Sequence, residues 1–454
     1  MVKLIGMVLN TSTKKEEEQQ MKLIERILSE ENLNEAIKRV KANKGAPGVD
    51  KMTYEEIENY FNEHKEEIIA SIMNKTYKPQ PVKRVYIPKS NGKLRPLGIP
   101  TLIDRVIQQA VANILSLGYE RYFSDNSFGF RPNRDCHKAI YRVLDYLNNG
   151  FEWVIDLDIE KFFDTVNQDK LISILREKVN DATTLHLIRS FLKAGIMENG
   201  LISSSTIGMP QGGPLSPILS NIYLDKLDKE LESRGLMFVR YADDCNIFVK
   251  SEMSANRVMK SITSWLERKL FLKVSATKTK VVKPSKSNFL GFGFYKDSSG
   301  WKCLPAKDRK AKLFKKVKEI LRRKHAVSRP LSITFIKLNQ IIRGWINYFR
   351  IGSMRKFLKE DFDPWYRHKI RLIIIKQWKI PKRIFINLQR LNKMFNNGFD
   401  EESIYKVANS RLGWFRRCGL NVVNYILSSK VLSLPNKKEN RPGLVIPLDY
   451  YLSK

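Results

Sequence analysis

The stretch LMFVRYADDCNIFV, residues 236–249, organises the rest of the chain. Two short apolar runs flank the adjacent carboxylates of Asp243 and Asp244. Runs of this kind around a tight bend predict a β-hairpin that holds both acidic residues at its turn. Two neighbouring carboxylates repel each other unless they share a positive charge, and a divalent metal ion is the obvious candidate. Taken alone, an ordinary Asp-rich turn explains the same residues equally well.

The chain is strongly basic, with 81 Lys and Arg against 47 Asp and Glu among 454 residues, a net charge of +34. Residues 301–454 contain 36 Lys and Arg but only 10 Asp and Glu, a net charge of +26. A basic excess this regional favours nucleic acid as a partner over the alternative of ordinary solvated, lysine-rich helices. The length allows about two to four domains with a sizeable core.

The cysteines do not indicate a disulfide framework or a zinc site, because Cys136, Cys245, Cys303 and Cys418 are far apart and form no CxxC pair. This use of cysteine fits a reducing compartment. No run approaches the ~18 apolar residues of a membrane span, and the apolar start of the chain is too short for a signal peptide. We therefore expect a cytoplasmic protein without a membrane partner.

The order of the expected elements predicts an α+β domain with a mostly antiparallel sheet, followed after residue 301 by basic amphipathic helices. Two strands, 82–88 and 94–99, form a basic hairpin, and the apolar strand Trp153–Asp158 ends in carboxylates. A Gly- and Pro-rich segment, 208–214, opens the helix that leads to the acidic hairpin. The remaining expected elements are helices over 21–41, 57–72, 102–121, 168–178, 215–234 and 254–270, a strand near 271–274 and a paired strand over 289–295.

Asp158 and Asp243 are the carboxylates that we expect to meet on one sheet. Together they would hold two divalent ions roughly 3.5–4 Å apart, as in-line nucleotidyl transfer requires. One ion activates an attacking 3′-hydroxyl, and the other steadies the triphosphate and its pyrophosphate leaving group. Asp244 would be an auxiliary acid, whereas Asp156 and Asp164 are interpreted as structural. A helix-capping role is the alternative for Asp158 in isolation.

Several motifs, in this order along the chain, resemble the sequence blocks of reverse transcriptases: Asp158 to Phe163, Pro210-Gln211-Gly212 and Tyr241-Ala242-Asp243-Asp244. The segments SFGFRP, residues 127–132, and RGWINYF, residues 343–349, are similar to those of group II intron-encoded reverse transcriptases, also called maturases. The resemblance runs from about residue 31 to 380. The short chain most resembles the bacterial class C proteins.

This resemblance implies a right-hand polymerase that makes DNA on an RNA template with two Mg²⁺ ions, for which Mn²⁺ can substitute. It also implies help in splicing the parent intron and in target-primed retrohoming. The implied partners are group II intron RNA, an RNA template, a DNA primer or target DNA and dNTPs, in the bacterial cytoplasm at the nucleoid or in a ribonucleoprotein. The implied domains are an N-terminal tail (1–30), fingers and palm with an N-terminal extension (31–300), a helical thumb or maturase domain (301–385) and a small basic DNA-binding domain (386–454).

Carried over position by position, the resemblance makes Asp158, Asp243 and Asp244 the catalytic acids. The metal shell would be formed by Asp158, Asp243 and the backbone carbonyl of Ile159. Lys278 lies where a lysine can protonate pyrophosphate and is a possible general acid.

The same comparison gives dNTP-binding roles to Lys89, Arg95, Phe163 and Gln211. Lys89 and Arg95 would grip the triphosphate through charge-assisted bonds, although lysines on a hairpin are ordinarily just solvated. Phe163 would close off the sugar 2′ position and so favour dNTP over NTP, although the usual meaning of a Phe is a core aromatic. Gln211 would lie beside the nascent base pair. Contacts with RNA or DNA are implied for Lys44, Arg131, Lys315, Lys316 and Arg343.

One departure from the family concerns the C-terminus, where some relatives carry an HNH endonuclease with paired cysteines and this sequence shows nothing similar. Cleavage of the second DNA strand by this chain is therefore not expected. Two alternatives stay open: a domesticated reverse transcriptase that serves phage defence or DNA repair, and chiefly an RNA-binding splicing factor.

Overall fold

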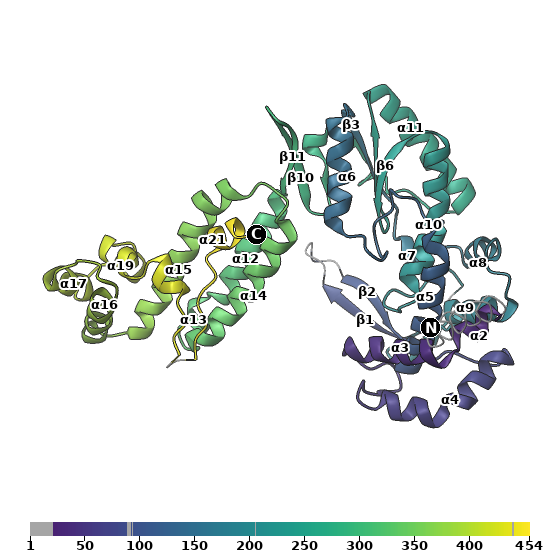
Figure 1. Cartoon of the computed structure of the whole chain (residues 1–454), viewed down its shortest axis with the longest axis horizontal. Coiled ribbons are helices and arrows are strands. Elements are labelled where there is room, and N and C mark those ends of the chain that lie inside the picture. Colours follow the sequence, from purple (N-terminus) through teal and green to yellow (C-terminus); the bar gives the residue numbers. More distant parts are fainter. Residues whose placement is uncertain (1–20, 89–91, 93, 205, 438–439) are drawn as a thin grey trace, which may run out of the picture. The chain divides into compact units, whose positions relative to one another are not determined.

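The computed structural model describes residues 21–88, 92, 94–204, 206–437 and 440–454. The chain forms two compact units, Met1–Lys283 and Pro284–Lys454 (Figure 1). Helices and small sheets are mixed along it, so the α+β class predicted from the sequence is confirmed.

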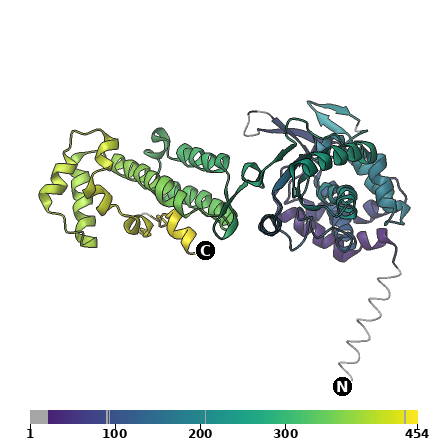
Figure 2. The same cartoon turned by 90° about the horizontal axis from the view of Figure 1, so that it is seen from above.

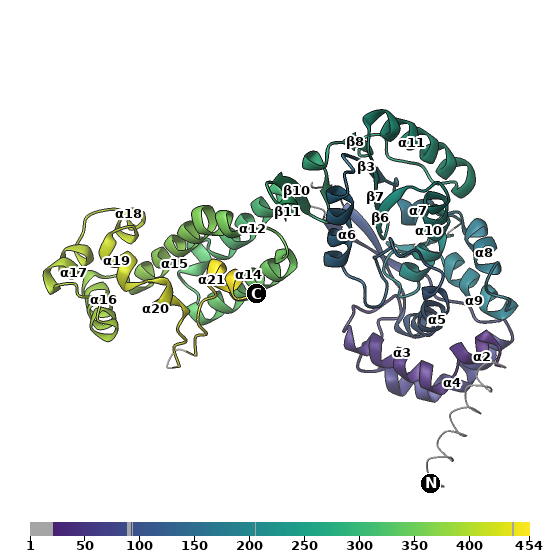
Figure 3. The ribbon, with the colours of Figure 1, turned by 45° about the horizontal axis from the view of Figure 1, so that its top comes forward.

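A four-stranded antiparallel sheet in the first unit carries the acidic residues, and its strand order is β6-β7-β3-β8. The central strands are buried by helices on the sheet, which explains why they read as nearly continuous apolar runs. Figure 1 and Figure 3 show the helices α6, α10 and α11 around this sheet, and all three contact its strands. The bounds are β3 Trp153–Asp158, β6 Met237–Tyr241, β7 Asp244–Val249, β8 Lys280–Val282, α6 Cys136–Asn148, α10 Ser216–Ser233 and α11 Glu252–Trp265.

A second sheet of the first unit, in the order β2-β1-β4-β5, contains the predicted basic hairpin. β1, Val82–Pro88, pairs antiparallel with β2, Leu94–Ile99. β4, Ile196–Glu198, joins β1 in parallel, and β5, Leu201–Ser203, forms the edge. β4 and β5 were not predicted because three residues are too few to show the alternation of a strand.

The helix α5, Leu102–Glu120, contacts α2, α3, α4 and α10 and is buried along most of its length. Thr101 begins it as an N-cap, because its hydroxyl accepts the N–H of Asp104. Asp104 is itself buried and accepts hydrogen bonds from Tyr77 and the N–H of Gln80, which fixes the helix start. The other helices of this unit are α2 Leu23–Ile27, α3 Glu30–Ala42, α4 Ile57–Met73, α7 Phe162–Thr165, α8 Gln168–Arg176, α9 Ala182–Lys193 and the π-helix η1 Leu266–Leu270.

The second unit begins with a small antiparallel sheet and continues as helices. Rings of Phe314, Phe357, Phe362 and Trp365 pack edge to face in its core. The C-terminal helix α21 returns to α14, and Figure 2 shows this yellow end beside the green helices. The elements are η2 Pro284–Lys286, β9 Asn288–Phe289, β10 Phe292–Asp297, β11 Gly300–Pro305, α12 Lys307–Ile320, α13 Arg323–Ala326, α14 Leu331–Phe349, η3 Phe357–Phe362, α15 Asp363–Trp378, α16 Pro381–Phe395, α17 Glu401–Ala408, α18 Trp414–Cys418, α19 Asn421–Ile426, α20 Ser429–Ser433 and α21 Pro447–Leu452.

Two expected strands are wrong in extent or partner. The strand near 271–274 is reduced to one bridge between Val274 and Ile159, because η1 extends the preceding helix to Leu270. The strand over 289–295 is broken by a turn at Leu290 and Gly291. Its two halves pair with each other and with β11 rather than with a strand at 271–274. The helical pattern therefore begins at Lys307 rather than at residue 301.

Candidate active site

The predicted hairpin forms, and it holds the acidic pair at its bend. β6 ends at Tyr241 and β7 begins at Asp244, so Ala242 and Asp243 make a two-residue turn. Ala242 has a φ of 56°, a left-handed conformation that is uncommon for a residue with a side chain. In the neighbouring pairing, Asp158 at the end of β3 lies directly opposite Asp244. The structure thus gathers the three predicted catalytic acids at one end of one sheet.

A short loop after η1 holds Asp158 by its backbone and by its carboxylate. The N–H of Ser275 donates to the carbonyl of Asp158 at 2.9 Å, and the N–H of Asp158 donates to Oγ1 of Thr279 at 3.1 Å. Lys278 Nζ donates to both carboxylate oxygens of Asp158 at 3.0 Å. Lys278 was singled out in the sequence, whereas Ser275 and Thr279 were not, since hydroxyl residues in a loop carry no distinctive pattern.

The environment of the acidic turn raises the pKa of both its carboxylates. Desolvation raises the pKa of Asp243, and the charge of Asp158 raises it further, while Arg95 and Lys278 act in the opposite direction. Desolvation and the charges of Asp243 and Asp158 raise the pKa of Asp244 to about 6. The Asp244 side chain is exposed, so the neighbouring negative charges of Asp243 and Asp158 are the main cause of this raised pKa. The cluster is therefore short of positive charge.

These residues fit a Mg²⁺ ion that binds together with a nucleotide. No three Asp, Glu, His or Cys side chains in the described ranges are grouped closely enough to hold a metal by themselves. Mg²⁺, however, is commonly held by one or two carboxylates plus the phosphates of a substrate, rather than by an all-protein cage. The Lys278 ammonium already balances the charge of the Asp158 carboxylate, as a bound metal ion would. Asp158 and Asp243 are hard oxygen donors of the kind that Mg²⁺ prefers.

Phe163 and Gln211, which were both predicted to bind the nucleotide, line the same cavity of about 500 Å³. Phe163 is half-buried, and its ring meets that of Phe162 edge to face at 5.2 Å. The carbonyl of Gln211 accepts the N–H of Gly98 on β2 at 2.7 Å, which ties this segment to the basic hairpin. Gly212 has a φ of 119°, and a Cβ there would lie 2.4 Å from the carbonyl oxygen of Gly98, so this close approach requires glycine.

A buried arginine that was not predicted as a site residue supports the acidic turn from behind. Arg240 is 0% exposed, and its guanidinium makes two hydrogen bonds, of 2.7 and 2.5 Å, to the equally buried carboxylate of Asp228 on α10. Its Nη1 also donates to the carbonyl of Ala242 at 2.9 Å and to Asn221 at 3.1 Å. The ion pair thus reaches the strained residue of the turn. The available signal was an arginine in an otherwise apolar strand.

The SFGFRP segment is part of this support. The N–H of Phe128 donates to the carbonyl of Arg240, and a Cβ at Gly129 would lie only 2.3 Å from the backbone nitrogen of Ala242. Asn221 Nδ2 donates to the carbonyl of Gly129 at 2.8 Å. The segment therefore packs its backbone directly against the acidic turn.

The assignment of Arg131 to nucleic-acid binding is wrong for this structure. Arg131 is 7% exposed, and its guanidinium donates to the Glu120 carboxylate and to the carbonyls of Ser124 and Ser127. A guanidinium that is buried and bonded on all sides cannot also bind a phosphate. Arg131 instead holds the SFGFRP loop to the end of α5.

The other predicted residues lie in varied settings. Lys89 falls outside the described residues. Ile159 is buried in the core, and Arg95 is exposed on β2 with its charge acting on Asp243. Lys44 is exposed in a left-handed turn. In the second unit Lys315, Lys316 and Arg343 are exposed on α12 and α14, and Arg343 lies over the ring of Tyr450 at 5.9 Å.

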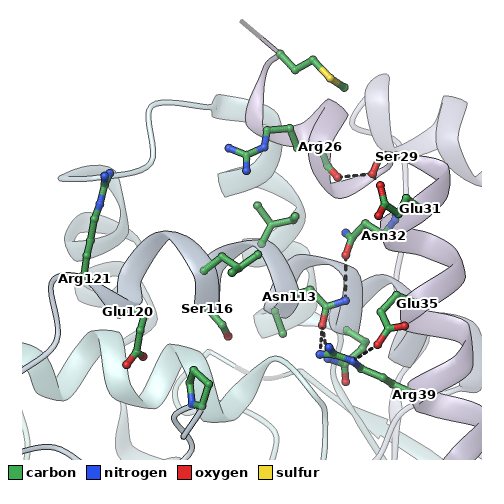
Figure 4. Close-up of a pocket in the computed structure, with 16 residues that line it drawn as sticks. Arg26, Ser29, Glu31, Asn32, Glu35, Arg39, Asn113, Ser116, Glu120 and Arg121 are labelled. Carbon is green, nitrogen blue, oxygen red and sulfur yellow. Dashed lines mark hydrogen bonds and ion pairs between the residues drawn. The ribbon is translucent and has the colours of Figure 1, made fainter. Parts of the chain in front are cut away.

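A larger groove of about 1060 Å³ lies between α2, α3 and α5, and none of the predicted catalytic residues lines it. Figure 4 shows its polar side chains bonded to one another: Arg39 donates to Glu35 and Asn113, and Asn113 donates to Asn32. Arg26 and Arg121 also line it. This groove belongs to the N-terminal helices rather than to the acidic sheet.

Comparison with protein families gives two matches. Residues 87–294 match "Reverse transcriptase (RNA-dependent DNA polymerase)", and residues 310–391 match "Group II intron, maturase-specific domain". The first match contains the acidic hairpin, Asp158, Phe163 and Gln211, and the second covers most of the helices α12 to α16. No helix of the described chain has the length and apolar character needed to cross a membrane.

Two curated relatives are similar over long segments. The group II intron-encoded protein LtrA of Lactococcus lactis subsp. cremoris is 42% identical over 207 residues, which is 45% of this chain and 34% of LtrA. Protein YkfC of Escherichia coli K12 is 33% identical over 300 residues, 57% of this chain and 79% of YkfC. The alignment thus spans about a third of LtrA and most of YkfC. A solved chain of a partial Cas6-RT-Cas1–Cas2 complex matches at 23% identity with a TM-score of 0.35, over 55% of this chain and 43% of that chain, a likeness too weak to bear on fold or function.

Proposed function

The chain belongs to the group II intron reverse transcriptase and maturase family, and on that premise we propose that it is an RNA-directed DNA polymerase. The observation that carries this proposal is the convergence of Asp158, Asp243 and Asp244 at one end of the β6-β7-β3-β8 sheet. We assign the fingers and palm to residues 31–300, the thumb to 301–385 and a small DNA-binding domain to 386–454.

In the proposed reaction the primer 3′-hydroxyl loses its proton to solvent, and its oxygen forms a bond to the α-phosphorus of a dNTP. The bond from that phosphorus to the bridging oxygen breaks, and pyrophosphate leaves with the electron pair. Asp158 and Asp243 would hold Mg²⁺, with the backbone carbonyl of Ile159. Bound there, Mg²⁺ supplies charge stabilisation to the attacking and leaving oxygens. Lys278, whose Nζ donates to both oxygens of Asp158, would hold the proton that the leaving pyrophosphate takes up.

The chain's own residues would position the nucleotide. Arg95, together with Lys89, would hold the triphosphate by charge-assisted hydrogen bonds. Phe163 and Gln211 line one cavity, so a sugar ring and a nascent base pair would contact them from one side. If the basic hairpin moved toward a bound triphosphate, the hydrogen bond between Gly98 and Gln211 would move the Gln211 segment with it, toward the base pair.

Primer extension by the full chain on an RNA template with dNTPs and Mg²⁺ tests the proposal. We expect full-length DNA product that depends on all four dNTPs and disappears with EDTA. A chain that binds the primer–template duplex but adds no nucleotide under these conditions would contradict the assignment of a polymerase.

Replacing Phe163 by Val or Ala should increase the use of NTPs. A flat ring leaves no room for a 2′-hydroxyl, and a smaller side chain restores that room, so we expect the preference for dNTP over NTP to fall by about tenfold or more. The measurement is the ratio of kcat/KM for dCTP and CTP. Phe162, which is fully buried beside it, offers a matched control, because Phe162→Leu should lower stability without changing this ratio. An unchanged ratio in the Phe163 variants would remove Phe163 from the role.

The apparent affinity for Mg²⁺ should fall as the solution is acidified. Asp244 has its pKa raised to about 6, so protons compete with the metal for the cluster at higher pH than for an ordinary carboxylate. Between about pH 7.5 and 5.5 we expect an approximately threefold loss of Mg²⁺ affinity. The metal-free chain should change in the opposite direction and gain stability, because a carboxylate with a raised folded-state pKa is relieved when it takes up a proton.

Isothermal titration with Mg²⁺ and thermal unfolding at both pH values measure these two effects. Asp244→Asn should flatten both pH profiles, while Asp164→Asn, which changes an exposed carboxylate outside the cluster, should leave them unchanged. Profiles for Asp244→Asn that match those of the parent chain would show that another group titrates.

A second candidate function, promotion of intron splicing, is favoured by the maturase-specific match at residues 310–391. Splicing would require binding of the parent intron RNA rather than catalysis by the acidic cluster. The exposed Lys315 and Lys316 lie side by side on α12 in the matched segment. The groove of Figure 4, with Arg26 and Arg121, and the exposed Lys44 offer further contacts for RNA.

Neutralising Lys315 and Lys316 to Gln should weaken binding of intron RNA by about tenfold and lower the dependence of affinity on salt by about two phosphate contacts. Splicing of a precursor RNA should fall in parallel, whereas Asp243→Ala should splice like the parent chain. The matched control is Lys382→Gln together with Arg383→Gln, an equally exposed basic pair on α16. Equal losses in both pairs would show that total charge, rather than α12, carries the binding.

A further inference from the structure

A pocket of about 600 Å³ in the second unit has not been assigned to any step above. It lies where α15 meets the segment from α18 to α20, and Figure 3 shows these short helices around α15. Its lining residues come from one long helix on one side and from short helices and turns on the other: Pro364, Arg367, His368, Arg371, Gly419, Asn424, Tyr425, Ser428 and Ser429.

The lining is positively charged. Arg367 and Arg371 are four residues apart on α15 and therefore lie on the same face of that helix. None of the described residues that line the pocket is acidic. Asp363, four residues before Arg367 on α15, does not line the pocket; it accepts the N–H of Leu448, and the charge of Arg367 acts to lower its pKa. Two cations thus line one pocket whose described lining has no acid.

Arg371 is fixed and Arg367 is not. Arg371 is 5% exposed and donates to the carbonyl of Leu427 and to Oδ1 and the carbonyl of Asn424, which are all uncharged acceptors. Burial, with the charge of Arg367, lowers the pKa of Arg371 to about 10. By contrast, Nε of Arg367 and Nε2 of His368 are buried without a hydrogen-bond partner. Buried polar atoms of this kind are normally satisfied. Nε of Arg367 is always a donor, and Nε2 of His368 donates when the ring carries its proton there, so together they point to a ligand that accepts hydrogen bonds.

Aromatic rings flank the pocket. Tyr425 lines it, is 64% exposed, and lies 6.0 Å from the ring of Phe399. Phe415, 57% exposed, lies 4.2 Å from the ring of His368, and Lys369 Nζ lies over Phe415 at 5.4 Å. Exposed rings beside a cationic groove are the arrangement by which proteins bind single strands, since each unpaired base offers a flat face.

We propose that this pocket binds one phosphodiester of a single-stranded nucleic acid, with the adjacent unpaired base stacked on Tyr425. The phosphate oxygens would accept hydrogen bonds from Arg367 and His368, while Arg371 holds the C-terminal end of α19 in place and contributes charge. A continuous duplex keeps its bases stacked inside, so it would reach the cations but not Tyr425. The inference deepens the proposed function, because it rests on the chain being a nucleic-acid-binding protein and adds where and in what form the strand is held.

The test measures binding of the full chain to fluorescein-labelled DNA of about 20 nucleotides, to RNA of the same sequence and to the DNA duplex, by anisotropy without dNTPs. Arg367→Gln should weaken binding to the single strands by about tenfold, the loss expected for one charge-assisted phosphate contact. Arg390→Gln removes the same charge from an exposed position of α16 that does not line the pocket, and should cost about twofold or less. Equal losses for the two variants would overturn the proposal.

Tyr425 supplies the second readout. Tyr425→Ala should weaken binding to single strands by about fivefold or more and leave duplex binding unchanged, since stacking needs an unpaired base. Tyr405→Ala is the matched control, because Tyr405 is 58% exposed on α17 and does not line the pocket. A loss in either single strand supports the pocket and shows which strand it prefers, whereas an equal loss on the duplex would overturn the base-stacking part.

Two checks keep the outcomes distinct. Arg367→Lys keeps the charge and should recover part of the affinity that Arg367→Gln loses. If the loss came from misfolding instead, Arg367→Lys would bind as weakly as Arg367→Gln and its circular dichroism spectrum would differ from that of the parent chain. Primer extension by the unmodified chain tests the polymerase separately. If extension fails while Arg367→Gln still loses single-strand binding selectively, the polymerase assignment is wrong and the pocket stands.

Discussion

Asp243→Asn is expected to lower the rate of primer extension by about 10³-fold or more, whereas Asp244→Asn should lower it by only about tenfold to a hundredfold. The expectation follows from the proposed roles, in which Asp243 holds the metal directly and Asp244 only tunes the cluster. The measurement is single-nucleotide extension at saturating primer–template, with Mg²⁺ varied for each variant. Asp164→Asn, an exposed carboxylate in the helix after Asp158, is the matched control and should extend normally.

Comparing the Asp243 and Asp244 variants is decisive, because the strand register by itself favours Asp244 as the partner of Asp158. Asp244, not Asp243, lies directly opposite Asp158 across the β3–β7 pair. Side chains of directly opposed residues lie on the same face of a sheet, so Asp158 and Asp244 lie close together in space when no nucleotide is bound. Asp243 lies in the turn, where the charges of Arg95 and Lys278 act on it. Equal losses, or a larger loss for Asp244→Asn, would assign the direct metal contact to Asp244.

Breaking the buried ion pair behind the turn should have the second large effect. Asp228→Asn leaves the guanidinium of Arg240 buried without the carboxylate to which it is bonded, and we expect it to cost about 3–5 kcal/mol of unfolding free energy. Primer extension should fall with it, since Arg240 also donates to the carbonyl of Ala242 at the acidic turn. Thermal or urea unfolding and extension assays measure the two losses on the same preparations.

A double variant separates stability from positioning. Arg240→Met with Asp228→Leu replaces the pair by apolar side chains, an exchange that is often neutral for stability. We expect the unfolding free energy to return toward that of the parent chain. kcat should stay low and KM for dNTP should change little, because the double variant removes the guanidinium that donates to the carbonyl of Ala242. Recovery of both stability and kcat would show that Arg240 serves the core only and does not position the turn.

Gly129 packs on the same turn, and a substitution there would disturb it from the other side. A Cβ at Gly129 would lie 2.3 Å from the backbone nitrogen of Ala242, so Gly129→Ala has to displace the turn without touching the ion pair. The buried network of Arg240, Asp228 and Asn221 and the SFGFRP loop therefore act on one residue, Ala242.

Local pattern was enough to predict the acidic hairpin, the strand that ends at Asp158, the basic hairpin and the long helices. Each of these elements is specified within a short window, by apolar alternation, by turn residues or by a cap such as Thr101. The strands β4 and β5 escaped prediction because three residues carry no period. The strand at 289–295 was predicted to pair with the wrong strand. Apolar residues indicate that a strand is buried, but they do not indicate which strand pairs with it.

Site residues divide in the same way. Asp158, Asp243, Phe163 and Gln211 could be predicted as site residues because carboxylates and ordered motifs are recognisable one by one along the chain, and their roles stay predictions. Arg131 was misassigned because an arginine in a loop looks available to phosphate until Glu120 is seen beside it. Arg240 was missed for the opposite reason, since its partner Asp228 lies twelve residues away on another element.

The sequence by itself determined the fold class, the family and the identity of the acidic residues, because these depend on residue type and on spacing within short segments. Only the tertiary structure decided which charges are used internally and which remain for ligands. Arg131 and Arg240 are bonded to buried or half-buried carboxylates, whereas Arg367 faces a pocket without one. The physical reason is that the availability of a charge depends on its desolvation and its partners, and both are set by contacts between residues distant in the chain.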